Sequence, residues 1–417
     1  MNLSAAVSGL CNSLKNFFQA IGNVSYAASQ LLILIVLLKN GGFRAAGDYS
    51  LSQAIIAPIF GFLAFSLRPY WVSGVIRSLD MYQFFQLRII SIVGGAGLVF
   101  VTKRLLFPTV DDSIFIMVFT LKSAELISDV FYAALDVAGR SATAGKLLMG
   151  KALVFGVCGG LFFLMDVSIA SFQHAIYLVI AFVLVVELRV MEFSPTTFVN
   201  AMSTGRVRLI SLFHFISWAS ASSVVISVAS FLPRYLLEEF YGRDAVGYYS
   251  IVSAPAIVVL MICTGLAQTE LGKLSAAHAR RDWPLFSGIM YVRGFLLAGL
   301  AFVAACAAAG LIFTQKLLGL DLIPLKMGYE ISALLVLFVP LYLAQFLSYA
   351  VMPLARVRET FALALVSLLL QAAVSPLLIQ WDRLYGAVAV SVVGSLVQAV
   401  GFSFLLGRYF HLQRFHE

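Results

Sequence analysis

The chain of 417 residues is 61% hydrophobic and only 12% charged, with a mean hydropathy of +0.97. A soluble domain carries about 25% charged residues, so this composition excludes a soluble globular protein. The net charge of +8 indicates basic loops that face anionic lipid, and it does not indicate a nucleic-acid-binding surface.

Apolar runs long enough to cross a bilayer, about 17–25 residues each, recur along the whole chain. In the first half we expect spans near residues 17–38, 48–67, 85–101, 113–133, 147–164 and 172–186. The less hydrophobic stretch EFSPTTFVNAMSTGRVR then precedes spans near 210–232, 248–267, 286–312, 331–350, 362–379 and 384–406. The sequence therefore predicts an all-α, multi-pass membrane protein with about twelve spans, in two six-helix bundles at 1–195 and 196–417.

The basic residues between the spans predict the orientation of the chain. Lys and Arg favour the side of the N-terminus by roughly two to one, which predicts that both termini are cytoplasmic. The first span is too long for the apolar region of a cleavable signal peptide, so we expect it to be retained. The four cysteines have no metal-ligand spacing, and we expect no metal site.

Two pairs of segments suggest that the second half of the chain repeats the first. Residues 47–54 read GDYSLSQA and residues 247–254 read GYYSIVSA. Likewise FYAALDVAGR at 131–140 is echoed by SYAVMPLARV at 348–357. The first pair opens spans two and eight and the second lies in spans four and ten, so the halves share one membrane orientation. Such parallel repeats place a transport site between the halves; the alternative is chance similarity among apolar helices.

The fourth expected span carries a stripe of ionisable side chains at helical spacing. Lys122, Glu125, Asp129 and Asp136 all fall on one helical face of residues 113–140. An ionisable group at membrane depth costs about 2.5 kcal/mol or more unless it faces protein, water or another charge. The stripe predicts a polar cavity, and the alternative is that Lys122 and Glu125, one turn apart, neutralise each other.

Two segments of the chain resemble a known family. Residues 233–282 contain Pro233–Arg234, then Gly242, Gly247 and Ser250, and then a basic amphipathic stretch from Lys273 to Asp282. This pattern, together with residues 122–150, is similar to the polysaccharide (O-antigen or capsule repeat-unit) flippases of the multidrug/oligosaccharidyl-lipid/polysaccharide exporter superfamily. The resemblance extends over nearly the whole chain.

The resemblance implies a V-shaped bundle around a central cavity in the bacterial inner membrane. The implied function is alternating-access translocation of undecaprenyl-diphosphate-linked oligosaccharide. A polysaccharide polymerase and a chain-length regulator are implied as partners beside membrane lipids. The chain contains no GxxxxGK[ST] motif, so we expect a secondary transporter coupled to H⁺ or Na⁺, with no cofactor, and not an enzyme.

A lipid-linked sugar diphosphate requires cations for its head group and acceptors for its hydroxyls. Lys122 is the best deep cation, and Arg68 and Arg293 are second-rank cations. Glu125, Asp129 and Asp136 are candidate acceptors of sugar hydroxyls. Candidates for proton or ion coupling are Asp129, Glu125 and His214 in the seventh span.

Two prolines are candidate hinges for alternating access. Pro58 and Pro255 each follow soon after one of the repeated Gly-x-Tyr-Ser entries. A proline inside a helix removes one hydrogen bond and kinks it. We therefore expect the second and eighth spans to bend at these positions.

Three other specific functions, and a transporter of unknown cargo, remain open at the level of sequence. A drug/cation antiporter of the same superfamily shares the twelve spans and the repeat, but it is expected to lack a deep lysine such as Lys122. A major-facilitator transporter also has two six-span halves, but the loop after the second span lacks that family's G-x-x-x-D-R-x-G-R-R pattern. A membrane-embedded glycosyltransferase or polymerase needs acidic residues in a large external loop, and only Asp111–Asp112 in a short loop is a candidate.

Overall fold

The computed structural model describes residues 3–63, 67–72, 80–165, 167–192, 209–292, 325–354 and 356–414, with Arg293 and most positions between 294 and 324 outside the description. Of some helical residues, among them 3–17 and 209–216, only the backbone is described. Every regular element in these ranges is helical, with no strand among them, which confirms the all-α prediction.

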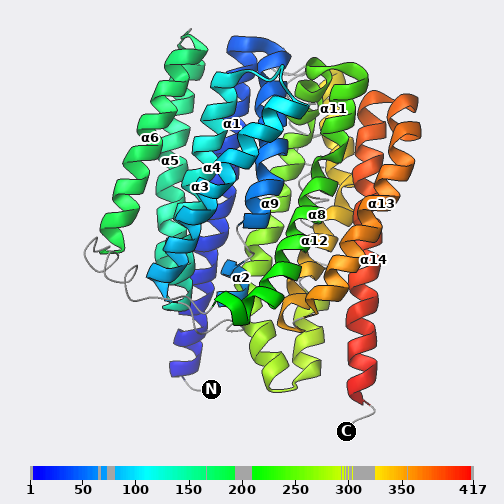
Figure 1. Cartoon of the computed structure of the whole chain (residues 1–417). Helices are drawn as coiled ribbons and strands as arrows, with labels where there is room; N and C mark the ends of the chain where they lie inside the picture. The colour runs from blue at the N-terminus through cyan, green and yellow to red at the C-terminus, as the bar shows by residue number, and fades with distance from the viewer. Residues whose placement is uncertain are drawn as a thin grey trace. The chain divides into compact units, whose positions relative to one another are not determined.

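The helices fall into two units, Met1–Val228 and Ala229–Glu417, described separately. The first contains α1 (Leu3–Leu63), α2 (Leu67–Val72), α3 (Met81–Leu106), α4 (Asp112–Val137), α5 (Ser141–Leu164), α6 (Ile169–Val190) and the start of α8 (Leu209–Tyr241) (Figure 1). The second contains the rest of α8, α9 (Arg243–Ala279), α11 (Leu325–Leu337), α12 (Val339–Val351), a 3₁₀ turn (Met352–Leu354), α13 (Val357–Trp381) and α14 (Arg383–Arg414). The expected boundary at residue 195 lies outside the described residues and stays a prediction.

The helices match the predicted spans in length and composition. Nine helices among the described residues are long and apolar enough to cross a membrane. One of them, Ile21–Leu63, covers the first two expected spans. The 26-residue α4 is long enough but carries five charged residues and is not counted, while Trp283–Val292 is a shorter apolar helix at the start of the ninth expected span. Each of the twelve expected spans therefore coincides with helix, the ninth only in part.

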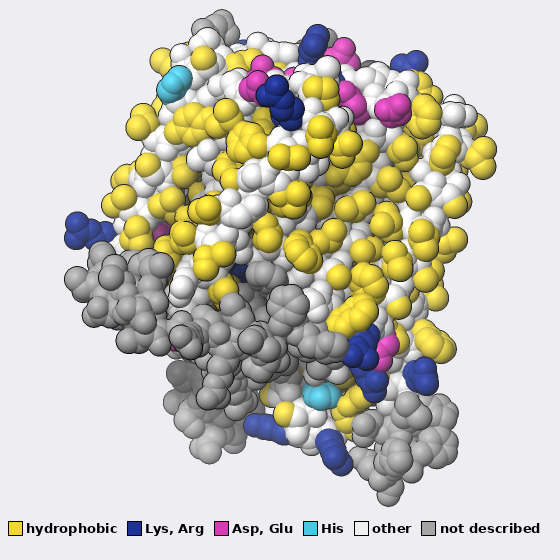
Figure 2. Space-filling model, in the orientation of Figure 1, with side chains coloured by type: hydrophobic (Ala, Val, Ile, Leu, Met, Phe, Trp, Pro, Cys, Tyr) yellow, Lys and Arg dark blue, Asp and Glu magenta, His cyan; other side chains and the backbone are white. Residues whose placement is uncertain are grey.

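The helix surfaces have the polarity of a membrane protein. Large apolar side chains are exposed on the helix flanks, for example Leu153 on α5, Leu178 on α6 and Leu369 on α13. On the face shown in Figure 2, hydrophobic side chains cover the helix flanks, and Lys, Arg, Asp and Glu gather near helix ends. Exposed apolar area of this extent requires a hydrocarbon solvent.

Side-chain caps determine where α3, α4 and α6 begin. Asp80 and Gln83 form a capping box at the start of α3, and Ser168 accepts a hydrogen bond at the start of α6. Asp111 caps α4 by accepting from the Ile114 amide at 2.9 Å. Partial burial tends to raise the pKa of Asp111, but hydrogen bonds from Ser113 and the Ile114 amide hold it below its usual value.

The connection between the first two expected spans is a single residue, not a loop. Gly42 interrupts α1 with φ 67° and ψ −169°, and the residues on either side are helical. Gly242, 200 residues further on, separates α8 from α9 with φ 76° and ψ −177°. Both conformations lie in a region of backbone space that is essentially restricted to glycine. The chain therefore makes the same sharp turn at the same place in each half.

Burial follows the repeat as well. Tyr49 and Tyr249 are both buried, and so are their neighbours Ser50 and Ser250. The second pair of segments also agrees, because Tyr132 on α4 and Tyr349 on α12 are buried, each followed by a fully buried alanine. Common turns and common buried positions favour parallel repeats over chance similarity.

The Gly42 turn can be tested by adding a methyl group. Gly42→Ala should lower the free energy of unfolding by about 1–3 kcal/mol, because only the backbone conformation is penalised: a Cβ at this position would meet no atom within 4 Å. The measurement is thermal unfolding of the purified protein in detergent. Gly94→Ala is the matched control, since Gly94 is helical, exposed and equally uncrowded, and it should be neutral or stabilising by up to about 1 kcal/mol. Equal effects at both positions would contradict the assignment.

Candidate functional site

The predicted stripe on α4 is the centre of a polar cluster within the first unit. We call it the α4 cluster. It comprises Lys122, Glu125, Ser128, Asp129, Tyr132 and Asp136 of α4, with Tyr26 and Gln30 of α1, Arg68 of α2, Arg88 of α3, Lys151 of α5 and Glu187 of α6. The helices α1 to α6 other than α4 therefore each contribute at least one polar side chain to the face or flanks of α4.

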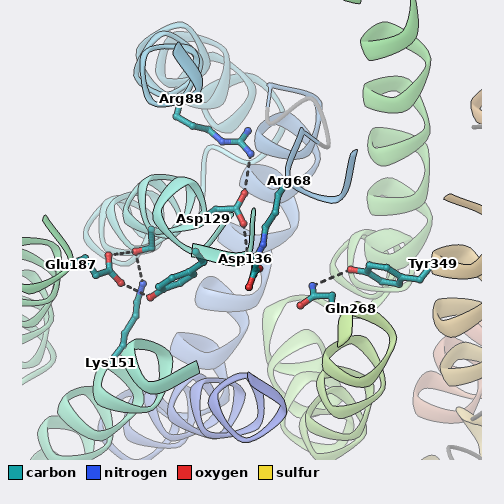
Figure 3. A network of polar contacts seen from close by, with 10 residues as sticks. Arg68, Arg88, Asp129, Asp136, Lys151, Glu187, Gln268 and Tyr349 are labelled. Carbon is teal, nitrogen blue, oxygen red and sulfur yellow. Dashed lines mark hydrogen bonds and ion pairs between the residues drawn. The ribbon is translucent and has the colours of Figure 1, made fainter. Parts of the chain in front are cut away.

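Two arginines bind the aspartates at the C-terminal half of α4. The guanidinium of Arg68 lies 3.0 Å from an oxygen of Asp129 and 3.0 Å from an oxygen of Asp136. Arg88 donates to the other oxygen of Asp129, also at 3.0 Å. Figure 3 shows Arg88 and Arg68 converging on Asp129 from α3 and α2. The two carboxylates thus share two guanidinium groups in a continuous chain of ion pairs.

Arg68 and Arg88 are also held by aromatic rings. The guanidinium carbon of Arg88 lies 4.8 Å from the centroid of Phe84, and that of Arg68 lies 5.9 Å from the centroid of Tyr132. A cation over an aromatic face gains about 0.5–2 kcal/mol, most where water is excluded. The rings fix the direction in which each guanidinium points toward Asp129.

One turn earlier on α4, Glu125 accepts hydrogen bonds from three donors. Its carboxylate accepts from the Lys122 ammonium at 2.8 Å, from the Tyr26 hydroxyl at 2.7 Å and from the Gln30 amide at 2.6 Å. Lys122 and Glu125 therefore do pair with each other, as the alternative interpretation of the sequence required. The pair is nonetheless open, because the side chains of Lys122 and Glu125 are 20% and 24% exposed.

A third group lies on the opposite flank of α4 and is fully buried. Glu187 accepts hydrogen bonds from the Ser128 hydroxyl at 2.7 Å and from the Tyr132 hydroxyl. Lys151 donates to the same Ser128 hydroxyl at 3.0 Å and lies 5.0 Å from the ring centroid of Tyr26. Ser128 therefore bridges the buried ammonium of Lys151 and the buried carboxylate of Glu187, both of which are labelled in Figure 3.

Exposure separates the cluster into two rows. Glu187, Arg88 and Lys151 are only 1%, 2% and 5% exposed. Arg68 and Asp129, in contrast, are 18% and 26% exposed at the side chain. We call the four partly exposed residues Arg68, Lys122, Glu125 and Asp129 the front row, and Arg88, Lys151 and Glu187 the back row. The front row can contact a solute, whereas the back row can only keep the front row oriented.

The second unit has a neutral side chain at the position that corresponds to Arg68. Gln268 of α9 stands 200 residues after Arg68, and its amide donates to the hydroxyl of Tyr349 at 3.2 Å. Tyr349 is the repeat partner of Tyr132, the ring beside which Arg68 lies. An arginine–tyrosine contact in one unit is thus an amide–tyrosine contact in the other, so this position is charged only in the first.

Some predicted residues lie elsewhere or outside the described part of the chain. Arg293 is not among the described residues, and of His214 only the helical backbone is described. Pro58 lies inside α1 and Pro255 inside α9, both in continuous helix. No group of three or more His, Cys, Asp or Glu side chains among the described residues could hold a metal ion. The roles proposed for all these residues stay predictions.

The back row is not predicted from the sequence. The predicted orientation counts Arg88 and Lys151 as basic residues of the loops, although each lies a few positions inside an expected span. In the structure both are buried in helices. Glu187 comes directly after the expected end of the sixth span and lies inside α6. The available signal is an isolated charge near the end of an apolar run, and it does not distinguish a loop residue from a buried one.

The pairing can be tested with a double-mutant cycle. Asp129→Asn should destabilise the protein by about 2 kcal/mol, because it removes the carboxylate that faces the buried Arg88. Adding Arg88→Met should recover at least about half of that lost stability, because the buried charge of Arg88 is then removed together with its partner. The measurement is thermal unfolding in detergent.

Asp112→Asn is the matched control for this cycle. Asp112 pairs with Lys103, but its side chain is 83% exposed. Its loss should cost less than about 1 kcal/mol. Strictly additive effects of Asp129→Asn and Arg88→Met would contradict the ion-pair chain.

Comparison with known proteins gives one sequence relative and several structural ones. No family model matches the chain. A capsular polysaccharide biosynthesis protein, CapF, of Staphylococcus aureus is 22% identical over 413 residues, which covers 95% of this chain and 100% of that protein.

The structural likenesses are to transporters. The outward-facing conformation of a multidrug resistance MATE family transporter of the MOP superfamily superposes with a TM-score of 0.68 at 14% identity, covering 97% of this chain and 96% of that one. A mutant form of the MATE transporter VcmN of Vibrio cholerae gives a TM-score of 0.62 at 12% identity, covering 97% and 98%. The protein described here is a multi-pass membrane protein with the fold of the MATE transporters of the MOP superfamily.

Proposed function

We propose that this protein is a flippase that moves an undecaprenyl-diphosphate-linked oligosaccharide across the bacterial inner membrane by alternating access. The observation that carries the proposal is the front row of the α4 cluster, where cations and carboxylates are partly exposed side by side within a transporter fold. A head group that combines a diphosphate with sugar hydroxyls needs donors and acceptors of this kind together.

Arg68 and Lys122 are the cations available to the diphosphate. Both are paired within the protein, Arg68 with two aspartates and Lys122 with Glu125. A phosphate oxygen is a comparable acceptor, so it competes for these donors without leaving a cation unpaired. Arg68 presents a planar fork suited to two phosphate oxygens, and Lys122 acts as a point charge.

Glu125 and Asp129 are the acceptors and the candidates for ion coupling. When a phosphate takes Lys122 or Arg68, a carboxylate of the front row is released to accept sugar hydroxyls or to bind H⁺ or Na⁺. The back row keeps Asp129 and α4 oriented during this exchange, because Arg88 and Glu187 are shielded from solvent. Loading of cargo and loading of the ion are thereby linked through shared partners.

The sequence relative supports the class of cargo. CapF is named as a capsular polysaccharide biosynthesis protein and aligns with nearly the whole of this chain. Together with the transporter fold, this name supports transport of a polysaccharide precursor. In this proposal both termini are cytoplasmic, and a polymerase and a chain-length regulator act on the delivered repeat unit.

Drug/cation antiport is the second candidate, and the fold favours it because the structural relatives are multidrug transporters. The α4 cluster weighs against it. Its four cations, Arg68, Arg88, Lys122 and Lys151, balance its four carboxylates, whereas a site for cationic drugs needs an excess of acid. The glycosyltransferase alternative is weakened because both of its candidate acidic residues have other partners. Asp111 caps α4, and Asp112 binds Lys103.

Deletion of the gene tests the function directly. The deletion strain should accumulate undecaprenyl-linked oligosaccharide on the cytoplasmic leaflet and lose the corresponding surface glycan, because synthesis continues while translocation stops. Lipid extraction with leaflet-selective labelling measures the stranded intermediate. Loss of surface glycan without a stranded intermediate would overturn the proposal, and a changed drug tolerance with intact glycan would favour the antiporter.

Lys122 gives a residue-level test at equal expression. Lys122→Ala should lower glycan export at least about tenfold, because a charge-assisted contact to the diphosphate is lost. The fold should persist, since Glu125 keeps its bonds from Tyr26 and Gln30. Lys122→Arg should retain much of the export, and Lys103→Met, which removes a cation near the end of α3, should leave export unchanged. Full export by Lys122→Ala would exclude the diphosphate role.

A further inference from the structure

A buried arginine in the second unit lacks the carboxylate that the other deep cations have. Arg234 lies in α8 directly after Pro233, and it is only 9% exposed. Its guanidinium carbon lies 4.9 Å from the ring centroid of Phe231 and 5.7 Å from that of Tyr249. Its buried Nε has no hydrogen-bond partner. The guanidinium is therefore held by two aromatic faces, and no acid neutralises it within the described part of the chain.

The other cations that lie inside the two units make the contrast clear. In the first unit Arg68, Arg88 and Lys122 contact carboxylates directly, and Lys151 reaches one through a serine. In the second unit Arg243 pairs with Glu238. Two further acids there are also bound elsewhere, because Glu330 accepts from Tyr248 and Glu270 pairs with Lys273. None of these three acids forms an ion pair with Arg234, so its guanidinium remains available to a different anion.

The chemistry of the side chain limits what can complete this site. Arginine stays protonated in proteins, so Arg234 cannot avoid the cost of burying its charge by losing a proton. Aromatic faces stabilise a cation only in part, and a buried charge needs an opposite charge. Rings that hold a guanidinium plane leave its nitrogen edge open, and that edge matches the two oxygens of a phosphate or a carboxylate.

The internal repeat indicates that the fold does not require this arginine. Counted back eight residues from Gly242 and Gly42, Arg234 corresponds to Leu34, which is buried and apolar. The same helical position is thus occupied by leucine in one unit and arginine in the other. A charge that the framework does not need points to a ligand.

We propose that Arg234, held between Phe231 and Tyr249, binds an anionic phosphate or carboxylate group of the transported amphiphile. The ligand's identity rests on the proposed function, but the anion site itself does not. The site lies two turns before the end of α8, and the Gly242 turn follows that end. In the expected orientation this is the half of the unit away from the cytoplasm, so it would receive the acidic group late in translocation.

The test measures binding to the full chain in lipid nanodiscs, with empty nanodiscs as the blank. Farnesyl diphosphate is the phosphate probe, digalacturonate is the carboxylate probe and farnesol is the neutral control. Arg234→Leu should weaken at least one anionic probe by about tenfold or more, because a charged donor is lost. Weaker binding of farnesyl diphosphate would assign the site to the head group, and weaker binding of digalacturonate would assign it to an acidic sugar. Arg234→Lys should fall between wild type and Arg234→Leu.

Thermal unfolding of the same samples separates ligand binding from a structural role. Arg234→Leu should unfold at the same or a higher temperature, because an uncompensated charge is replaced by the residue that the repeat uses. Arg243→Leu is the matched control and should unfold earlier without weakening either probe, since it breaks the pair with Glu238. Probe affinities unchanged in Arg234→Leu, or no binding by wild type, would overturn the site. Binding at Arg234 in a protein whose deletion strands no glycolipid would overturn the proposed function and leave the site standing.

Discussion

The requirement that charge be paired in a low-dielectric environment organises the first unit. The helix α4 carries five charged residues in 26 positions, and four of them lie on or near one face. Ion pairs and hydrogen bonds from α1, α2, α3, α5 and α6 satisfy that face. Because an unpaired charge would cost several kcal/mol at this depth, neighbouring helices are constrained in rotation as well as in position. The polar cluster therefore stabilises the packing of the unit and is also its candidate site.

The two units share a framework and differ in chemistry. The matching turns at Gly42 and Gly242 and the buried Tyr49 and Tyr249 belong to the framework. The charge is distributed differently. Each described cation of the first unit's cluster reaches an acid, either directly or through Ser128. The second unit has neutral Gln268 in place of Arg68 and, at Arg234, a buried cation held by rings. A duplicated scaffold with unlike polar groups suits the proposed cargo, whose head group is itself asymmetric, with phosphate at one end and sugar at the other.

Partial exposure gives the cluster its potential for function. Lys151 and Glu187, which Ser128 bridges, are shielded from solvent, and they act by holding α4 in place. Arg68, Lys122 and Asp129 form direct ion pairs and remain partly exposed. At an opening, the cation of an ion pair can exchange its carboxylate for an anionic ligand at modest cost, since the cation keeps an anionic partner throughout. Such exchange is the physical basis of the proposed linkage between cargo and coupling ion.

The sequence by itself determined the solvent, the number of spans, the parallel repeat and the polar face of α4, because all four are periodic properties of a helical chain in hydrocarbon. It also allowed the Lys122–Glu125 pair, since residues three apart on a helix are neighbours. Only the tertiary structure decided that Arg68 bridges Asp129 and Asp136, that Arg88, Lys151 and Glu187 are buried, and that Arg234 faces rings without an acid among the described residues. Most of those contacts join residues far apart in the chain, and the burial of a side chain depends on what surrounds it. Helical periodicity shows which way a residue points along its own helix, but the packing of other helices decides what it meets there.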